Sequence, residues 1–228
     1  ESVKSQTMPD IDLIVVDDKS TDGSQEIVHK WMISNKERFN RLMLVQHKQN
    51  QGLGASRNTA FDLSDTLYVM ALDADNTLLS ECCEECFNII ESESAAFAYS
   101  IIEQFGDSKK LMGNRTFNPA DFIPNSGIDA MAMISKEAWS LVGGYTTHRM
   151  GWQDYDFWCR IVDRGLYGVH VPKTLAKYRV HQKSMLRTST DKVNNKLELI
   201  DWMESEHSWL SLTTPERTGH HVTSKLSD

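Results

Sequence analysis

The sequence predicts an α/β fold. The first observation behind this prediction is that short apolar runs alternate with segments whose apolar residues recur at helical spacing, with polar turn residues between them. The second is that two of the predicted strands end in carboxylates, at Asp17-Asp18 and at Asp73-Ala74-Asp75. The third is a composition of 40% hydrophobic and 25% charged residues over 228 residues, which is typical of a globular protein with a sizeable core.

The first part of the chain predicts two strand–helix units and a third strand. Residues 11–16 form an apolar run that leads into the turn-rich loop 19–24, so this run predicts a strand. Apolar residues at 27, 28, 31 and 32 then recur at helical spacing. The elements that follow are, in order, a strand over 42–45, a helix over 54–63 and a strand over 67–72.

The second part of the chain continues this alternation. A helix over 82–90 is followed by strands over 95–102 and 130–134. Ser135 is a good N-cap for a helix that stops at Gly143-Gly144, and a helix over 153–164 stops at Gly165. Two β-prone runs then follow, over 169–171 and 174–180, with Pro172 as a hinge between them.

The polar stretch 187–195 is the predicted domain boundary. Residues 1–187 would form the main domain, and residues 188–228 an amphipathic helix with a polar tail. Leu197, Ile200 and Met203 supply the apolar face of this helix, and the tail begins after Pro215.

Composition and charge exclude several functional classes. With 24 Lys and Arg against 32 Asp and Glu, the net charge is −8, and no basic run suited to nucleic acid is present. No apolar run approaches the ~18 residues of a membrane span, and no signal-peptide pattern opens the chain. Three of the four cysteines, Cys82, Cys83 and Cys86, are crowded into one predicted helix without a second Cys or His pair, so we predict buried structural thiols rather than a zinc site.

Carboxylates at the ends of two strands predict a ligand site. Ligands of open α/β sheets bind beyond the carboxyl ends of the strands, so Asp17-Asp18 and Asp73-Ala74-Asp75 would face one crevice. Two negative clusters in one crevice favour a bound divalent cation with oxygen ligands. The alternative is that these aspartates only form turns, as acidic residues at strand ends often do.

Three further segments add to this site. Arg57 follows a glycine-containing loop at the start of a helix and has a guanidinium suited to phosphate oxygens, although an exposed Arg in a flexible loop is the simpler alternative. Asp154 and Asp156 lie in the first turn of a helix, where the helix dipole favours the ionised form. His181 ends a strand and is a candidate third metal ligand or a structural histidine.

Taken together and in order, six segments resemble family 2 glycosyltransferases of the GT-A fold over residues 1 to about 187. These segments are Val15-Val16-Asp17-Asp18-Lys19-Ser20-Thr21-Asp22-Gly23-Ser24, Asn50-Gln51-Gly52 with Arg57-Asn58, Leu72-Asp73-Ala74-Asp75, Gly143-Gly144-Tyr145, Trp152-Gln153-Asp154-Tyr155-Asp156, and Tyr178-Arg179-Val180-His181. The resemblance implies a mixed sheet flanked by helices. It also implies inverting transfer of a sugar from a nucleoside-diphosphate sugar, most simply a UDP-sugar, to an acceptor hydroxyl, with Mn or Mg on the diphosphate.

The resemblance also implies residue roles. The donor nucleotide would contact Asp17, Asp18, Arg57, Asn58 and Asp73. The metal would be bound by Asp75, with Asp73 and His181 near it. Asp154 would be the general base, and Trp152 would stack on an acceptor sugar. The implied partners are a nucleotide sugar and a saccharide or lipid-linked saccharide, in the cytoplasm, with peripheral association at a membrane left open.

The residues themselves separate the two helical aspartates. Asp154 and Asp156 are two apart, so their side chains point about 200° apart and only one can face the acceptor. Asp154 lies nearer the free N–H groups of the first turn, which favours it as the base. Asp156 would then serve the fold, for example by pairing with Arg160 four residues on.

Two departures from the family pattern are visible. Gln153 stands where relatives usually carry Glu, which removes one negative charge from the acceptor side. No strand with a nucleotide-cradling loop precedes residues 11–16, so we expect roughly twenty further residues, the length of a strand, a loop and most of a helix, in a longer protein.

Two other classes remain as alternatives. A receiver domain of two-component signalling also pairs acidic residues with Mg, but it would be about half this length and would not need Arg57, His181 or the segment 152–156. A glycosyltransferase-like module that binds nucleotide sugar or glycan without turnover is the other. The segment 102–128, with Arg115, Phe117 and Phe122, is the predicted acceptor-side wall.

Overall fold

The computed structural model describes residues 1–212, apart from the side chain of Leu186. The polar tail predicted after Pro215 lies outside the described residues. None of the helices within 1–212 is both long and apolar enough to cross a membrane.

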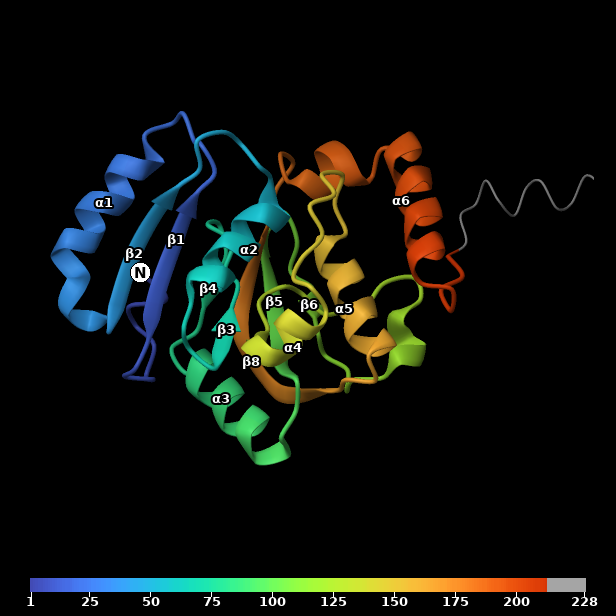
Figure 1. Ribbon diagram of the computed structural model, residues 1–228, viewed down its shortest axis with the longest axis horizontal. Helices are drawn as coiled ribbons and strands as arrows, with labels where there is room; N and C mark the ends of the chain where they lie inside the picture. Colours follow the sequence, from blue (N-terminus) through green and yellow to red (C-terminus); the bar gives the residue numbers. More distant parts are fainter. Residues whose placement is uncertain (213–228) are drawn as a thin grey trace, which may run out of the picture.

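The strands form a parallel pair and a larger mixed sheet (Figure 1). The pair consists of β1 (Asp12–Asp17) and β2 (Arg41–Gln46). The mixed sheet has the order β3-β7-β5-β8-β4, with β6 added to β5. Its strands are β3 (Tyr68–Met70), β4 (Thr77–Leu78), β5 (Phe97–Gly106), β6 (Leu111–Met112), β7 (Met133–Ser135) and β8 (Gly168–Val180). Only β5 and β8 run parallel in this sheet, so the predicted α/β class with a mixed sheet is confirmed.

Six α-helices surround these strands in the described chain. They are α1 (Ser24–Asn35), α2 (Leu53–Leu63), α3 (Cys82–Glu93), α4 (Lys136–Leu141), α5 (Gln153–Asp163) and α6 (Val193–Glu206). Figure 1 shows α1 on the outer side of the β1–β2 pair and α6 at the opposite end of the molecule. The predicted N-cap of α4 is confirmed, because Ser135 Oγ accepts a hydrogen bond from the Ala138 N–H at 3.1 Å.

Two strand predictions differ from the structure. β8 is one strand of 13 residues rather than two runs hinged at Pro172. Its register with β5 passes from Val171 directly to Thr174, so Pro172 lies in a bulge where its missing N–H breaks no ladder bond. The strand predicted over 130–134 starts only at Met133, because the Asp129 carboxylate accepts from the Met131 N–H and closes a turn there.

The mixed sheet has a hydrophobic core on each face. Alternate residues of β5 point to opposite faces, with Phe97 and Tyr99 in one core and Ala98 and Ile102 in the other. Helix α3 covers the second core, where Cys82 and Cys86 are fully buried, as predicted. Burial raises the pKa of the Cys83 thiol in the same helix to about 12, so this side chain is a neutral packing group.

Helix α6 belongs to the first core. Leu199, Ile200 and Met203 are buried, and the last two pack in the same cluster as Trp158 of α5. The helix begins at Val193, inside the stretch that the sequence indicated as a polar boundary. The α6 region is therefore packed against the main domain through its apolar face.

Gly54 in α2 marks a close approach between this helix and the segment before α5. A Cβ at this position would lie 2.0 Å from the Thr146 carbonyl oxygen. We expect Gly54→Ala to lower the free energy of unfolding by about 1–3 kcal/mol through overpacking, although alanine alone favours a helix. Urea denaturation measures this change, with Asp62→Ala on the exposed side of α2 as control, expected within about 0.5 kcal/mol. Equal stability of the two variants would contradict the close approach.

Candidate active site

The acidic loop after β1 is held by its own aspartates. Asp17 accepts from the Ser20 side chain and N–H and from Gln46 Nε2, and these bonds hold its pKa below the ordinary value. Asp18 accepts from the N–H groups of Gln51 and Gly52 at 2.7 Å each. The acidic loop is therefore joined to the glycine-containing loop before α2, as expected if both face one ligand.

His47 completes the surroundings of Asp18. Its Nδ1 lies 2.7 Å from an Asp18 oxygen, and its Nε2 lies 2.9 Å from Thr59 Oγ1 in α2. Burial raises the pKa of Asp18, but the hydrogen bonds from Gln51, His47 and Gly52 outweigh it and leave the pKa below its usual range. The sequence analysis did not single out His47, and only its position directly after β2 could have indicated it.

Arg57 and Asp73 form a half-buried ion pair between α2 and the end of β3. Arg57 Nη2 donates to both Asp73 oxygens, at 2.9 and 3.1 Å. The guanidinium also lies 5.3 Å from the centre of the Tyr145 ring. Burial would lower the pKa of Arg57, but the charge of Asp73 more than offsets this and raises it. Arg57 Nε is buried and has no hydrogen-bond partner among the described residues, which leaves it available to a ligand.

Asn58 joins α2 to the segment that precedes α5. Its amide donates to the Tyr145 carbonyl at 2.8 Å and accepts from the Tyr145 N–H at 2.7 Å. Both polar atoms of the side chain are thus used by the backbone of one residue. Asn58 therefore positions Tyr145 and the Arg57 guanidinium over it.

Asp75 and His181 lie together although 106 residues separate them in sequence. His181 Nε2 is 3.2 Å from an Asp75 oxygen, and both side chains are about two-fifths exposed. Asp73 instead directs both oxygens to Arg57, and nowhere in residues 1–212 do three His, Cys, Asp or Glu side chains converge as a metal cluster. One imidazole and one carboxylate still fit Mn or Mg if phosphate oxygens and water supply the other ligands.

The segment after His181 is tied to the β5–β6 turn. Asp107 in this turn accepts from Gln182 Nε2 at 3.0 Å and from Arg187 Nη1 at 3.3 Å. The turn lies within the segment 102–128 that the sequence predicts as the acceptor-side wall. The two sides of the candidate site are therefore connected by side-chain bonds.

The start of α5 carries Trp152, which packs against the first core, and Asp154, which lies in the electrostatic field of Arg57 and Asp73. Trp152 has left-handed backbone angles, φ 60° and ψ 19°, which are unusual for a bulky residue, and its ring packs edge-on against Tyr155. One Asp154 oxygen accepts from the Tyr155 N–H at 2.9 Å. Burial raises the pKa of Asp154, while the Arg57 charge acts in the opposite direction. Gln153 is buried and donates to the His148 carbonyl at 2.6 Å, so here it anchors the loop before α5.

Asp156 faces away from the crevice into a buried network. It accepts from Arg160 Nε and Nη2 at 3.0 and 2.6 Å, so the expected contact with Arg160 is present. Its other oxygen lies 3.2 Å from Nε2 of His207, whose Nδ1 is 2.6 Å from an Asp163 oxygen. Burial would lower the pKa of His207, but the bonds to Asp156 and Asp163 raise it overall. This network connects α5 to the end of α6.

Asp129 is a crevice residue that the sequence analysis missed. It precedes β7 in no recognisable motif, and only the fold brings its carboxyl into the electrostatic field of Asp154, Asp73 and Arg57. Burial, strengthened by the charge of Asp154, raises its pKa to about 7. Asp129 thus shares the crevice with the predicted base and keeps a proton under mildly acidic conditions.

We expect Asp129→Asn to change how stability depends on pH. Between about pH 4, where an unfolded aspartate titrates, and pH 7, folded Asp129 holds a proton that the unfolded chain has lost. The wild type therefore loses stability as pH rises across this window, and the variant lacks that loss. Urea denaturation at intervals from pH 4 to 8 should show the variant gaining on the wild type with rising pH. Parallel curves would contradict the burial of Asp129.

Sequence comparison identifies the family. The family model described as glycosyl transferase family 2 matches residues 1–156, which contain the loops at Asp18 and Asp73 and the start of α5. The chain belongs to this family. It is a glycosyltransferase, as predicted.

Curated relatives of this glycosyltransferase include two bacterial enzymes. The putative teichuronic acid biosynthesis glycosyltransferase TuaG of Bacillus subtilis is 25% identical over 222 residues, covering 95% of this chain and 81% of TuaG. The Escherichia coli enzyme WfaP, named UDP-Glc:alpha-D-GlcNAc-diphosphoundecaprenol beta-1,3-glucosyltransferase, is 24% identical over 188 residues, covering 81% of this chain and 72% of WfaP.

Solved structures confirm the GT-A fold of the family 2 chain. S. aureus TarS 1-349 in complex with UDP-GlcNAc superposes with a TM-score of 0.73 at 16% identity, over 93% of this chain and 62% of that one. The mannosyltransferase PcManGT from Pyrobaculum calidifontis, in complex with GDP-Man and Mn2+, gives 0.63 at 18% identity, over 81% of this chain and 52% of that one. The present chain thus spans less than two thirds of either solved protein.

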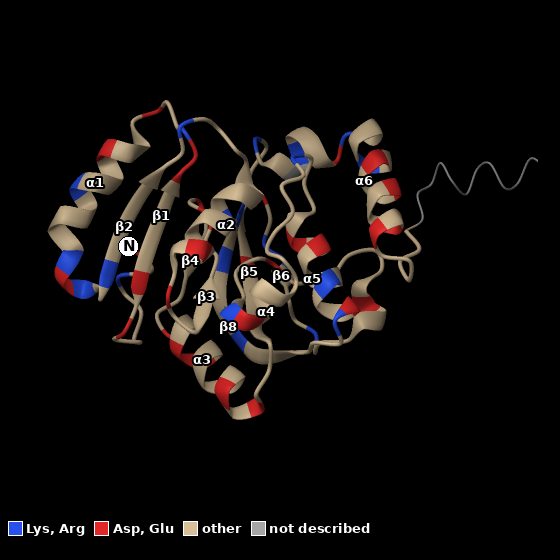
Figure 2. Cartoon of the chain, in the orientation of Figure 1, with Lys and Arg blue, Asp and Glu red and all other residues tan. Residues whose placement is uncertain are grey.

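Lys and Arg gather into no single stripe over the described chain (Figure 2). The cations that matter for the site are individual, with Arg57 inside the crevice and Arg179 beside Asp75. This distribution suits a small anionic ligand better than an extended polyanion.

Proposed function

We propose that this glycosyltransferase transfers a sugar from a UDP-sugar to a hydroxyl group of a glycan or lipid-linked saccharide, with inversion at the anomeric carbon. The observation that carries this proposal is the position of Asp154, which lies half-buried at the start of α5 and in the electrostatic field of Arg57 and Asp73. A carboxylate with a raised pKa at the edge of a polar crevice is suited to accept a proton.

The chain's own residues account for each part of the transfer. Asp18 holds the two loops that would enclose the nucleotide, and Arg57 offers its unpartnered Nε to a donor oxygen. Asp154 takes the proton of the acceptor hydroxyl as this oxygen attacks the anomeric carbon. The attack comes from the face opposite the departing diphosphate, so the configuration inverts.

A divalent cation fits the pair formed by Asp75 and His181. This pair supplies one carboxylate and one imidazole, both accessible, which suits Mn or Mg with a diphosphate as further ligand. When bound, such a cation would stabilise negative charge on the leaving group. Asp73 pairs with Arg57 and so holds this guanidinium in place. TarS was solved with UDP-GlcNAc, the name of WfaP mentions UDP-Glc, and PcManGT was solved with GDP-Man and Mn2+, which supports a nucleotide-sugar donor and a divalent cation.

Release of nucleoside diphosphate from a panel of nucleotide sugars, with and without Mn, tests the proposed activity. We expect nucleoside diphosphate to be released from UDP-sugars and not from GDP- or TDP-sugars, with an increase when a saccharide acceptor and Mn are present. Proton NMR of the product would show the inverted anomer. Donor binding without any release would identify a binding module instead.

We expect Asp75→Ala to abolish metal-dependent binding of UDP. Loss of the carboxylate leaves the His181 imidazole as the single protein ligand, too weak to hold Mn or Mg beside the diphosphate. A thermal-shift titration with UDP, with and without Mn, measures this as the loss of the Mn-dependent part of the shift. Asp65→Ala, an exposed aspartate between α2 and β3 that pairs with Arg41, is the control and should keep the full shift. An unchanged Mn-dependent shift in Asp75→Ala would place the cation elsewhere.

A further inference from the structure

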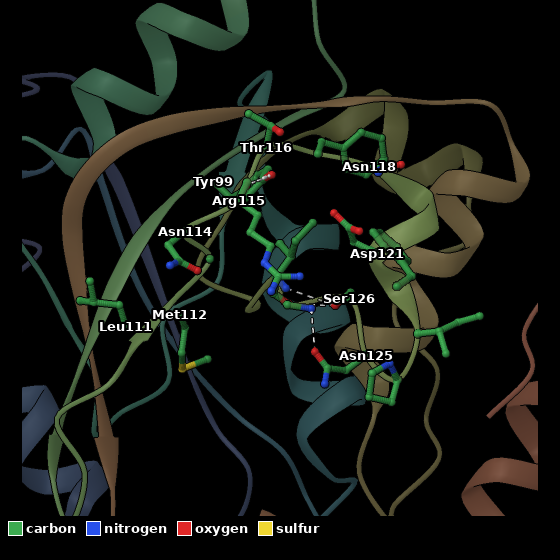
Figure 3. Close-up of a pocket in the computed structure, with 17 residues that line it drawn as sticks. Tyr99, Leu111, Met112, Asn114, Arg115, Thr116, Asn118, Asp121, Asn125 and Ser126 are labelled. Atoms are coloured by element: carbon green, nitrogen blue, oxygen red, sulfur yellow. Dashed lines mark hydrogen bonds between the residues drawn. The ribbon is translucent and has the colours of Figure 1, made fainter. Parts of the chain in front are cut away.

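A pocket lies beside the crevice on the acceptor side and is lined almost entirely by one segment. The cavity measures about 430 Å³ and is bounded by residues from Leu111 to Ile128, with Tyr99 of β5 as the one contribution from elsewhere (Figure 3). This volume lies within the range of small-molecule sites. The proposed transfer does not by itself assign a ligand to this pocket.

Two features connect the pocket wall to the surroundings of the proposed base. The Phe122 carbonyl, in the pocket wall, accepts from the Tyr155 hydroxyl at 2.5 Å, and Tyr155 directly follows Asp154. At the other end of the wall, Ile128 precedes Asp129, whose carboxyl lies in the electrostatic field of Asp154. The pocket wall is therefore joined to the helix that carries Asp154 and to the residue that precedes β7.

Arg115 is the one cation that lines this pocket. Its side chain extends into the hollow, between Asn114 on one side and Asp121 on the other (Figure 3). Its backbone carbonyl accepts from the Tyr99 hydroxyl, while its guanidinium forms no hydrogen bond or ion pair with any residue of the described chain, Asp121 included. An exposed guanidinium held over a cavity is suited to receive a carboxylate in a planar, bidentate pair.

The rest of the lining is typical of a saccharide site. The side-chain oxygens of Asn118 and Asn125 each accept from a local backbone N–H, so their NH₂ groups can donate to a ligand. Tyr99 and Phe117 add aromatic surface. Asp121 can accept from sugar hydroxyls, and its negative charge disfavours a dianionic phosphate beside a single Arg.

We propose that this pocket binds an acidic sugar unit of the acceptor, and that Arg115 pairs with its carboxylate. The proposal rests on the proposed function for the reaction at Asp154, and it adds the class of acceptor. One monoanionic carboxylate matches the one guanidinium, while the asparagines and Asp121 contact the sugar hydroxyls.

Direct binding of matched saccharides tests this proposal without any need for turnover. Three disaccharides that differ at a single carbon, which carries a carboxylate, a hydroxymethyl group or a phosphate monoester, are titrated into the full chain by calorimetry. We expect the wild type to bind the carboxylate form about 10- to 100-fold more tightly than the neutral form, as a charge-assisted pair provides.

The variants show whether Arg115 is responsible for this preference. Arg115→Met should remove the preference and leave affinity for the neutral disaccharide unchanged, while Arg115→Lys should retain part of it. Lys109→Met, an exposed cation outside the pocket in the β5–β6 turn, should keep the full preference. Equal binding of all three saccharides, a preference for the phosphate form, or a preference that survives in Arg115→Met would each overturn the proposal. UDP binding, measured separately, tests the donor side, so the two failures are distinguishable.

Discussion

Asp154→Asn is expected to lower the turnover number by about 10²–10⁴-fold, the usual contribution of a general base. The amide cannot accept the acceptor proton. Its oxygen can still accept from the Tyr155 N–H, so the start of α5 keeps its local structure. Donor affinity should be nearly unchanged, because the donor contacts proposed for Asp18 and Arg57 lie on other elements.

Two measurements check this expectation. Steady-state kinetics with saturating UDP-sugar gives the turnover number, and a thermal-shift titration with UDP gives donor affinity. In the wild type, activity should fall as the solution becomes acidic, because Asp154 must be ionised and burial raises its pKa. Normal turnover by Asp154→Asn would show that another group takes the proton.

Asp156→Asn is expected to lower the free energy of unfolding by about 3 kcal/mol, as found when one partner of a buried ion pair is removed. Asp156 is 3% exposed and is shared by Arg160 and His207. The amide would remove the carboxylate that pairs with the Arg160 guanidinium. The folded variant should still bind UDP, because Asp156 faces away from the crevice.

The loss of unfolding free energy in Asp156→Asn depends on pH. The pKa of His207 is raised in the folded protein, so pairing stabilises the fold fully below about pH 6.5 and is lost as pH rises through the folded pKa. Urea denaturation at pH 6 should therefore give a larger difference between wild type and Asp156→Asn than at pH 9. If Asp156→Asn is stable, binds donor and is inactive, the roles of the two aspartates are reversed.

Elements with a strong local pattern could be predicted from the sequence. The apolar run before Asp17, the Ser135 cap and the stop at Gly165 each carry their signal within a few residues, and the corresponding elements formed close to the expected positions. β4 and β6 were not predicted, because two-residue strands have no periodicity and depend on pairing with β8 and β5. The start of α6 was difficult for a related reason, since Asn194 and Asn195 are polar yet lie in a helix stabilised by packing at Leu199.

In the candidate site too, the contacts between residues far apart in sequence could not be predicted from local patterns. Before the fold was known, His181 was only one candidate ligand, and the family resemblance alone set it beside Asp75, since no local pattern connects residues 106 apart. The structure also shows that Asp73 pairs with Arg57, a choice among neighbours that spacing cannot reveal. Asp129 and His47 carry no motif, and what marks them is burial beside distant charges.

The bonds made by Asp107 give the two proposed substrate sites a common support. Asp107 holds Gln182, next to His181, and lies in the turn that leads into the Arg115 pocket. If the bound donor orders this turn, the affinity for the acceptor changes as well. Thermodynamic linkage then requires the acceptor to change the affinity for the donor by the same factor. Donor and acceptor affinities would then be coupled quantities, each defined only when the occupancy of the other site is stated.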